Sequence, residues 1–245
     1  MNREVQTEMY SSAFKQPCWC CGSTAGTRFR RVLWPELCAQ WALSDEEQEY
    51  IDRQQGEECE ACGSSLRTQA LAKAVLLTFR ARGPFEKFVR TLRGRSLRIL
   101  EINQAGELTK FFSRLSLHEL WEYPRLDMMN MPANFGERFD LILHGDTLEH
   151  VPDPVRGLAE CHRALKPGGA LCFTVPMIVG RLTRSRSGLA PSFHMKPGPD
   201  RDDFLVHTEY GADAWRQLID AGFSECRIIA IRPPIAHALI GIKAR

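Results

Sequence analysis

The chain has 245 residues, of which 44% are hydrophobic and 25% are charged, and its formal net charge is +2. These values suit a globular protein with one large domain, or with one standard domain and a small one. The near-neutral charge argues against a dedicated nucleic-acid binder. No apolar run reaches the roughly 18 residues that would cross a bilayer, and the polar segment 1–10 lacks a signal-peptide core. We therefore expect a cytoplasmic protein.

The cysteines are concentrated at the start of the chain, which indicates a small N-terminal module. Two segments of this module repeat the pattern Cys-x-x-Cys-Gly. Each such turn presents two sulfur atoms on one side, and two turns supply the four thiolates of a closed tetrahedral zinc site. Four thiolates leave no open position on the metal, so we expect a structural Zn²⁺ ion. Its expected ligands are Cys18, Cys21, Cys59 and Cys62.

Two questions about these cysteines stay open at the level of sequence. Cys20 could compete with its neighbours as a ligand, and Cys38 lies on an apolar helical face that suits a buried thiol. A redox-active Cys-x-x-Cys pair is the rival interpretation. It is weaker, because redox motifs come singly and next to a strand and a helix.

Helical spacing dominates the first part of the chain. It predicts helices within 34–53, over 71–80 and over 85–92, followed by a junction at 93–95. We expect a zinc-binding module over 1–75, a helical connector over 76–95 and a second domain over 96–245.

From Ser96 onward, short apolar runs alternate with helical patterns, which predicts a mostly parallel sheet with helices on both faces. Ligands of such sheets bind beyond the carboxyl ends of the strands, and the loop 101–106 is the natural place. Residues 180–206 are predicted to form a long substrate-side loop. The expected strands are 97–102, 118–123, 139–145, 170–176, 226–233 and 237–245, and the expected helices are 106–115, 154–165 and 212–223.

The segment 139–169 reads FDLILHGDTLEHVPDPVRGLAECHRALKPGG. It resembles the fourth strand, the following helix and the start of the fifth strand of class I S-adenosylmethionine-dependent methyltransferases of type 11. The resemblance extends over about 96–245 and implies a doubly wound, Rossmann-like sheet of seven strands. The segment C..CGSSLRTQAL also resembles a cysteine-bearing stretch found ahead of some bacterial methyltransferases.

Most members of that family carry a glycine-rich E/D-x-G-x-G-x-G loop after the first strand. The matching stretch here runs from Glu101 to Gly106 and retains only the last glycine. Since S-adenosylmethionine has no phosphate, the loop must approach a carboxylate, an ammonium group and a sulfonium. We expect Glu101 to meet the ammonium group directly or through water, Asn103 and Gln104 to offer amides, and Gly106 to permit close backbone approach.

The resemblance also assigns the rest of the cofactor. Glu122 matches the acidic residue that holds the ribose hydroxyls, and Asp127 matches the residue that accepts a hydrogen bond from the adenine amino group. Only four residues separate them, so either the second helix is missing or Asp127 takes the ribose role. Met128 is expected in the core or the adenine pocket. Asp146 either contacts the methionine part of the cofactor or caps the helix that follows.

Methyl transfer to a hydroxyl or a protonated amine benefits from a general base, and histidine suits neutral pH. His144 and His150 flank Asp146 beside the expected methyl group, and His144 is a candidate cofactor contact as well. Other candidates on the substrate side are His194, His207 and Tyr210. Each of these side chains could instead be structural. Glu149 is expected to be an exposed helix carboxylate, and Arg181, Arg184 and Arg186 either clamp an anionic substrate or lie in a solvated loop.

The leading interpretation is an S-adenosylmethionine-dependent methyltransferase that acts on an oxygen or nitrogen atom of a small molecule or glycan. One alternative is an RNA methyltransferase whose zinc module grips RNA, although phosphate contacts usually require a more positive charge. Another is a zinc-bearing binding protein without catalytic activity. We expect no membrane partner, and the sequence leaves the oligomeric state open.

Overall fold

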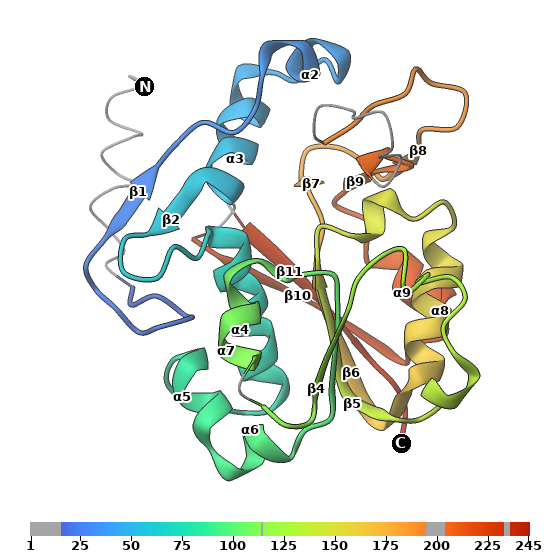
Figure 1. Ribbon diagram of the computed structural model, residues 1–245. Coiled ribbons are helices and arrows are strands. Elements are labelled where there is room, and N and C mark those ends of the chain that lie inside the picture. Colours follow the sequence, from blue (N-terminus) through green and yellow to red (C-terminus); the bar gives the residue numbers. More distant parts are fainter. Residues whose placement is uncertain (1–15, 114, 195–203, 233–235) are drawn as a thin grey trace.

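The computed structural model describes residues 16–113, 115–194, 204–232 and 236–245 (Figure 1). Its α-helices are α2 (Pro35–Gln40), α3 (Asp45–Gly56), α4 (Leu66–Thr78), α5 (Phe85–Arg90), α6 (Leu92–Ser96), α7 (Thr109–Phe112), α8 (Pro154–Ala164) and α9 (Arg216–Asp220). Short 3-10 helices are η1 (Gly106–Leu108), η2 (Ala133–Phe135) and η3 (Leu148–His150). The strands are β1 (Thr27–Phe29), β2 (Glu57–Cys59), β3 (Ile99–Ile102), β4 (His118–Trp121), β5 (Phe139–Gly145), β6 (Leu165–Thr174), β7 (Met177–Ile178), β8 (Arg184–Ser185), β9 (Thr208–Gly211), β10 (Glu225–Ile231) and β11 (Ala236–Ile242).

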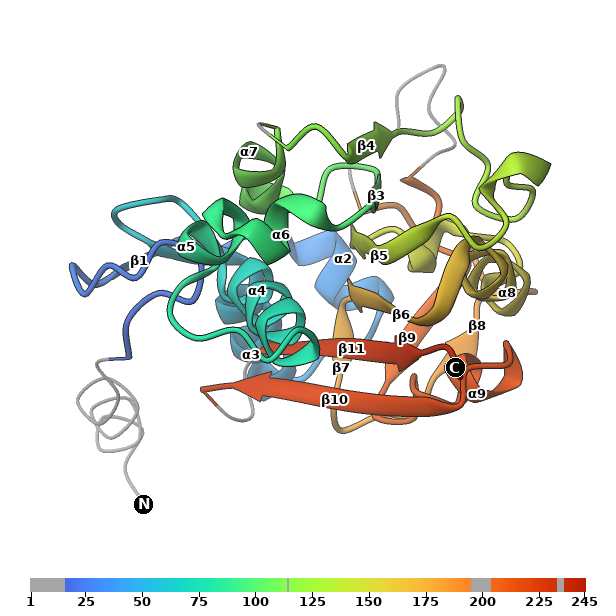
Figure 2. The ribbon, with the colours of Figure 1, turned by 90° about the horizontal axis from the view of Figure 1, so that it is seen from below.

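A sheet of six strands in the order β10-β11-β6-β5-β3-β4 forms the centre of the described chain. β3, β4, β5 and β6 run parallel to one another. β11 is antiparallel to both of its neighbours, and Figure 2 shows it beside β10. The predicted α/β class with a mostly parallel, Rossmann-like sheet is confirmed.

The sheet has one strand fewer among the described residues than we expected. The connection from β4 to β5 contains only the short helix η2, so β4 forms the edge and its partner strand and helix are missing. The short interval between Glu122 and Asp127 predicted this abbreviation of the second helix.

Helices cover both faces of the sheet, as Figure 1 shows for α4 and α7 on one side and α8 and α9 on the other. Side chains of β5 alternate between the two cores, because successive strand residues point to opposite faces. Leu141 and Leu143 belong to the core under α4, α5 and α7, while Ile142 packs with Leu158 of α8 and Leu218 of α9. The layers are therefore those of a doubly wound fold.

Helix α4 links the N-terminal elements to the sheet. Ser65 caps it by accepting a hydrogen bond from the backbone N–H of Thr68. The helix packs on β6, β10 and β11 on one side and contacts α3 on another, so most of its residues are buried. The expected boundary at residue 75 falls inside this helix, and the division into domains stays a prediction.

In the described residues, no helix combines the length and apolar character needed to cross a membrane.

The predicted long loop 180–206 has structure of its own in its described part. β8 pairs with β9, and β9 pairs with β7. Arg181 forms an ion pair with Glu47 at 2.6 Å and donates to the Trp41 carbonyl oxygen, which joins this region to α2 and α3. Residues 195–203 of the predicted loop lie outside the described residues.

Candidate functional site

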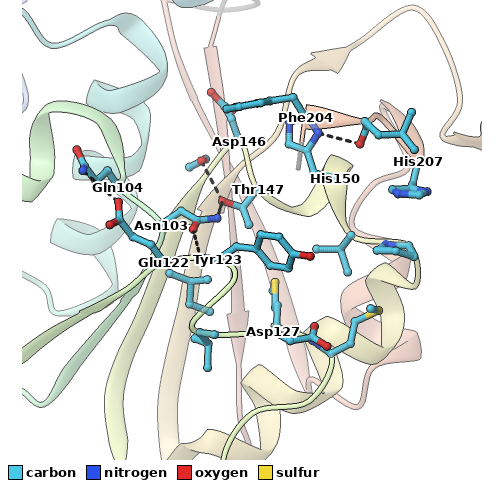
Figure 3. A pocket seen from close by; sticks show the side chains of 18 of the residues that line it. Asn103, Gln104, Glu122, Tyr123, Asp127, Asp146, Thr147, His150, Phe204 and His207 are labelled. Carbon is cyan, nitrogen blue, oxygen red and sulfur yellow. Dashed lines mark hydrogen bonds between the residues drawn. The ribbon is translucent and has the colours of Figure 1, made fainter. Parts of the chain in front are cut away.

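A pocket of about 990 Å³ opens at the carboxyl ends of the parallel strands. Its wall is built from the segments that follow β3, β4 and β5, and Figure 3 shows their side chains converging on one space. This is where doubly wound sheets bind ligands, and the volume suits a nucleoside-sized molecule. Of the residues expected at the site, the lining includes Asn103, Gln104, Glu122, Asp127, Met128, Asp146, His150 and His207.

The glycine-poor loop after β3 is held by side chains. Asn103 has a φ of 54°, a left-handed conformation that asparagine adopts more readily than most residues. Its side-chain oxygen accepts from the Tyr123 backbone N–H at 3.0 Å, and its amide donates to Thr147 Oγ1 at 3.3 Å. Asn103 therefore ties together the ends of three neighbouring strands (Figure 3).

Gly106 combines a left-handed backbone with a close contact, and both favour a residue without a Cβ. Its φ is 58°, and a Cβ built there would lie 2.8 Å from Thr68 Oγ1 of α4. The surviving glycine thus lets the loop approach the first turn of α4. Gly106 lines a second, smaller hollow beside the main pocket.

Glu101 lies in a different place from the one we expected. Its carboxylate is fully buried and accepts hydrogen bonds from the Ala105 N–H at 2.8 Å and Thr109 Oγ1 at 2.5 Å. His118 Nε2 lies 2.7 Å from its other oxygen. The Glu101 carboxylate therefore shapes the loop from below, and it is absent from the pocket lining.

Acidic and apolar groups follow β4. Glu122 and Asp127 are exposed side chains of the lining, and Met128 is buried beside them. Gln104 donates to Glu122 at 3.1 Å, so two predicted cofactor contacts meet directly. Asp127 Oδ1 accepts from the Met129 backbone N–H at 2.8 Å, which orients the carboxylate.

Asp146 stands where three hollows of the described surface meet. Its φ of 50° turns the chain sharply after β5, and its Oδ1 lies 2.7 Å from Nη1 of Arg67. The alternative role as a helix cap is wrong, because η3 has no side-chain cap. Arg67 was not among the predicted site residues. Its position in the first turn of α4, just after the second cysteine pair, was the available signal.

Two of the five candidate bases, which include His194, line the pocket. His150 and His207 are half-buried in its lining. His144 is fully buried on β5 against Phe173, neither ring nitrogen has a hydrogen-bond partner among the described residues, and burial lowers its pKa to about 4. Tyr210 is buried and donates to Gln217. His144 and Tyr210 thus belong to the core around the site.

Glu149 corrects a further expectation. We predicted an exposed carboxylate, but the residue is 1% exposed and lies between His150 and His194. The predicted anion clamp is also engaged inside the protein, because Arg184 and Arg186 both form ion pairs with Glu209.

The four predicted zinc ligands form one cluster. Their sulfur atoms all lie within 4.8 Å of one another, with 3.7 Å between Cys18 and Cys62 and 3.9 Å between Cys21 and Cys59. A tetrahedron with zinc–sulfur bonds of about 2.3 Å separates its sulfurs by about 3.8 Å, whereas a disulfide needs about 2.05 Å. The spacing fits a tetrathiolate metal site. Cys20 lies outside the cluster and contacts the Thr68 carbonyl oxygen.

Comparison with known proteins matches the part of the chain that builds the sheet and its pocket. Residues 83–173 match the profile of a methyltransferase domain family. The matched stretch, more than a third of the chain, contains β3, β4, β5 and most of β6, and with them most of the pocket lining.

Curated relatives match over a similar length. The ubiquinone biosynthesis O-methyltransferase of Pseudomonas syringae pv. tomato is 30% identical over 83 residues, which cover 34% of this chain and 36% of the relative. That of Azotobacter vinelandii is 29% identical over the same shares. The chain thus spans little more than a third of these relatives. Among solved structures, the CMeT domain of the citrinin polyketide synthase is similar with a TM-score of 0.46 and 16% identity, over 85% of this chain and 59% of that one.

The contact between Gly106 and Thr68 generates a prediction about stability. Gly106→Ala should destabilise the protein by about 1–2 kcal/mol from the left-handed backbone and by about 1–3 kcal/mol more from crowding. Gly188→Ala is the matched control, because Gly188 also has a positive φ but has open space where the Cβ would go. Urea denaturation measures both.

Thr68→Ala should remove the crowding part of the cost when it is combined with Gly106→Ala. If Gly106→Ala costs no more than Gly188→Ala, the close approach of the loop to α4 is wrong.

Proposed function

We propose that the protein is an S-adenosylmethionine-dependent methyltransferase that acts on an oxygen or nitrogen atom of a small molecule. The observation that carries this proposal is the pocket at the ends of β3, β4 and β5. It lies largely inside the stretch that matches the methyltransferase domain family. Amides and carboxylates surround it, which suits a cofactor with hydroxyl, amine and carboxylate groups and no phosphate.

The cofactor can be assigned along the pocket wall. The adenine would lie beside Met128, and its amino group would donate a hydrogen bond to the Asp127 carboxylate. The ribose hydroxyls would donate to Glu122, because a charged carboxylate is a strong acceptor for two hydroxyl donors. The amino-acid end would lie between Asn103 and Asp146. The buried Glu101 carboxylate supports this end by fixing the loop backbone.

An oxygen acceptor is the better supported choice. The matched relatives carry the name of an O-methyltransferase, and the lining near Asp146 combines His150 and His207 with apolar side chains such as Phe204. This surface suits a small molecule with an apolar part. Neither the pocket nor the net charge favours a nucleic acid.

The chemistry is an in-line displacement. When bound, S-adenosylmethionine would supply the methyl group: the bond between the methyl carbon and the sulfonium sulfur would break as the bond to the acceptor oxygen formed, and S-adenosylhomocysteine would leave. The acceptor loses its proton to a base, for which we propose His207 of the lining. The protein contributes mainly by aligning donor and acceptor and by excluding water.

Cofactor binding tests the proposal without knowledge of the acceptor. Calorimetry with S-adenosylhomocysteine should show one site per chain, and Asp127→Ala should weaken the affinity more than tenfold, because the adenine loses its acceptor. Asp220→Ala, an exposed aspartate of α9, serves as the control. Absence of binding below millimolar concentration would refute the methyltransferase proposal, and normal binding by Asp127→Ala would refute only the adenine assignment.

We also propose that Cys18, Cys21, Cys59 and Cys62 hold a structural Zn²⁺ ion. The sulfur spacing supports it, and so does the position of the cluster. The Cys62 carbonyl oxygen accepts from Lys110 of α7 at 2.5 Å, and Gly63 lies against Glu107. Metal at the cluster would therefore hold the first turn of α4 against the cofactor loop.

Metal analysis of the purified chain should return about one zinc ion. Cys59→Ser should lose the ion and lower the melting temperature, because the free energy of metal binding contributes to folding. Cys226→Ser is the control, since Cys226 is a half-buried thiol of β10 outside the cluster. Zinc retained in Cys59→Ser at the wild-type level would contradict the assignment.

A further inference from the structure

A second group of metal-ligand side chains lies beside the pocket, far along the chain from the cysteines. It consists of Glu149, His150 and His194, whose ligand atoms all lie within 4.8 Å of one another. Glu149 follows β5 directly, whereas His194 comes from the region after β8. The fold therefore brings distant residues to one point.

Glu149 is the unusual member of the group. The side chain is 1% exposed, and neither carboxylate oxygen has a hydrogen-bond partner among the described residues. Burying a carboxylate without hydrogen bonds is costly, so buried charges are normally paired with a charge or bound to a metal. The nearest nitrogens are His194 Nδ1 at 3.5 Å and His150 Nε2 at 3.8 Å from Oε1. Both separations exceed a normal hydrogen bond, which leaves space for an ion between the three groups.

The orientation of His150 points the same way. Its Nδ1 lies 3.0 Å from the Leu205 carbonyl oxygen, visible as a dashed line in Figure 3. A carbonyl oxygen only accepts, so Nδ1 carries a proton, and Nε2 is the ring nitrogen turned toward Glu149. A backbone carbonyl on the outer nitrogen is the usual arrangement for a metal-binding histidine. The ring of His194 is held against Trp41, with 5.9 Å between ring centres.

The donor set and the surroundings define the kind of ion. Two imidazole nitrogens and one carboxylate oxygen suit divalent transition metals such as Zn²⁺, Fe²⁺ or Mn²⁺. Bonds of about 2.1 Å separate neighbouring ligand atoms by about 3.0–3.4 Å, so the separations of 3.5 and 3.8 Å from Glu149 Oε1 would shorten by less than about 1 Å. All three residues line a hollow of about 590 Å³ whose wall also contains Trp34 and Trp41. An ion can enter there and keep open positions toward it.

We propose that Glu149, His150 and His194 form a second metal site, which binds a divalent cation with open coordination positions. The site is distinct from the cysteine cluster in its donor atoms and in its access to a hollow. His150 also lines the main pocket, so the cation would sit between the two spaces. Under the proposed methyl transfer, on which this role alone depends, the cation would hold an oxygen atom of the acceptor close to the methyl group.

Manganese binding tests the site directly. The full chain is first loaded with one equivalent of Zn²⁺, which the thiolates take up because they are soft ligands. Mn²⁺ is then titrated at pH 7.5, and the electron paramagnetic resonance signal of free Mn²⁺ is followed. We expect one saturable Mn²⁺ ion per chain, and at least tenfold weaker affinity in Glu149→Gln and in His194→Ala.

The controls separate a lost ligand from a damaged fold. Glu149→Gln keeps the shape of the side chain and removes a buried charge, so it should melt no earlier than the wild type. Glu225→Gln changes an exposed carboxylate of β10 and should bind Mn²⁺ normally. Wild-type protein without saturable Mn²⁺ binding, or Glu149→Gln with wild-type affinity, would overturn the proposal. Histidine–carboxylate ion pairs would then be the better description.

Affinity for S-adenosylhomocysteine is measured on the same samples. Bound S-adenosylhomocysteine without bound Mn²⁺ would refute the second metal site and leave the methyltransferase proposal standing. Bound Mn²⁺ without S-adenosylhomocysteine would do the reverse.

Discussion

The site depends on the first turn of α4. That turn follows Cys62 directly, and three neighbouring residues connect it to the rest of the site. Ser65 caps the helix, Arg67 forms an ion pair with Asp146, and Thr68 lies against Gly106. Because α4 is also packed on the sheet, the cysteine cluster, the cofactor loop and the end of β5 are fixed relative to one rigid element.

This arrangement explains how a loop with a single glycine can keep its shape. In a glycine-rich loop the backbone itself supplies the sharp turns. Here Asn103 adopts the left-handed conformation, and its side-chain amide forms hydrogen bonds with the segments that follow β4 and β5. Glu101 fills the space below, where its buried carboxylate accepts from the backbone and from Thr109. The hydrogen-bonding side chains thus replace the conformational freedom of the missing glycines.

The sequence predicted the features that depend on local pattern. The strand over 139–145 and the helix that begins at Pro154 lie as expected, because alternation, proline and glycine mark such elements within a few residues. The cysteine spacing likewise predicted a cluster that the structure brings together. The pocket residues were found through motif positions along the strand ends.

What the sequence could not predict depends on residues that meet only after folding. Glu149 was expected to be exposed because isolated carboxylates usually are, and its burial depends on His194, which lies 45 positions later. Arg67 has no partner within its own helix and finds Asp146 across the site. The missing seventh strand follows from the short β4–β5 connection, whose length indicated a lost helix but gave no strand count.

The most direct test of this account is a crystal structure of the full chain with S-adenosylhomocysteine. The account predicts the adenine beside Met128 and Asp127, the ribose at Glu122, and the amino-acid end between Asn103 and Asp146. An empty pocket at saturating ligand, or a ligand bound elsewhere on the chain, would contradict it.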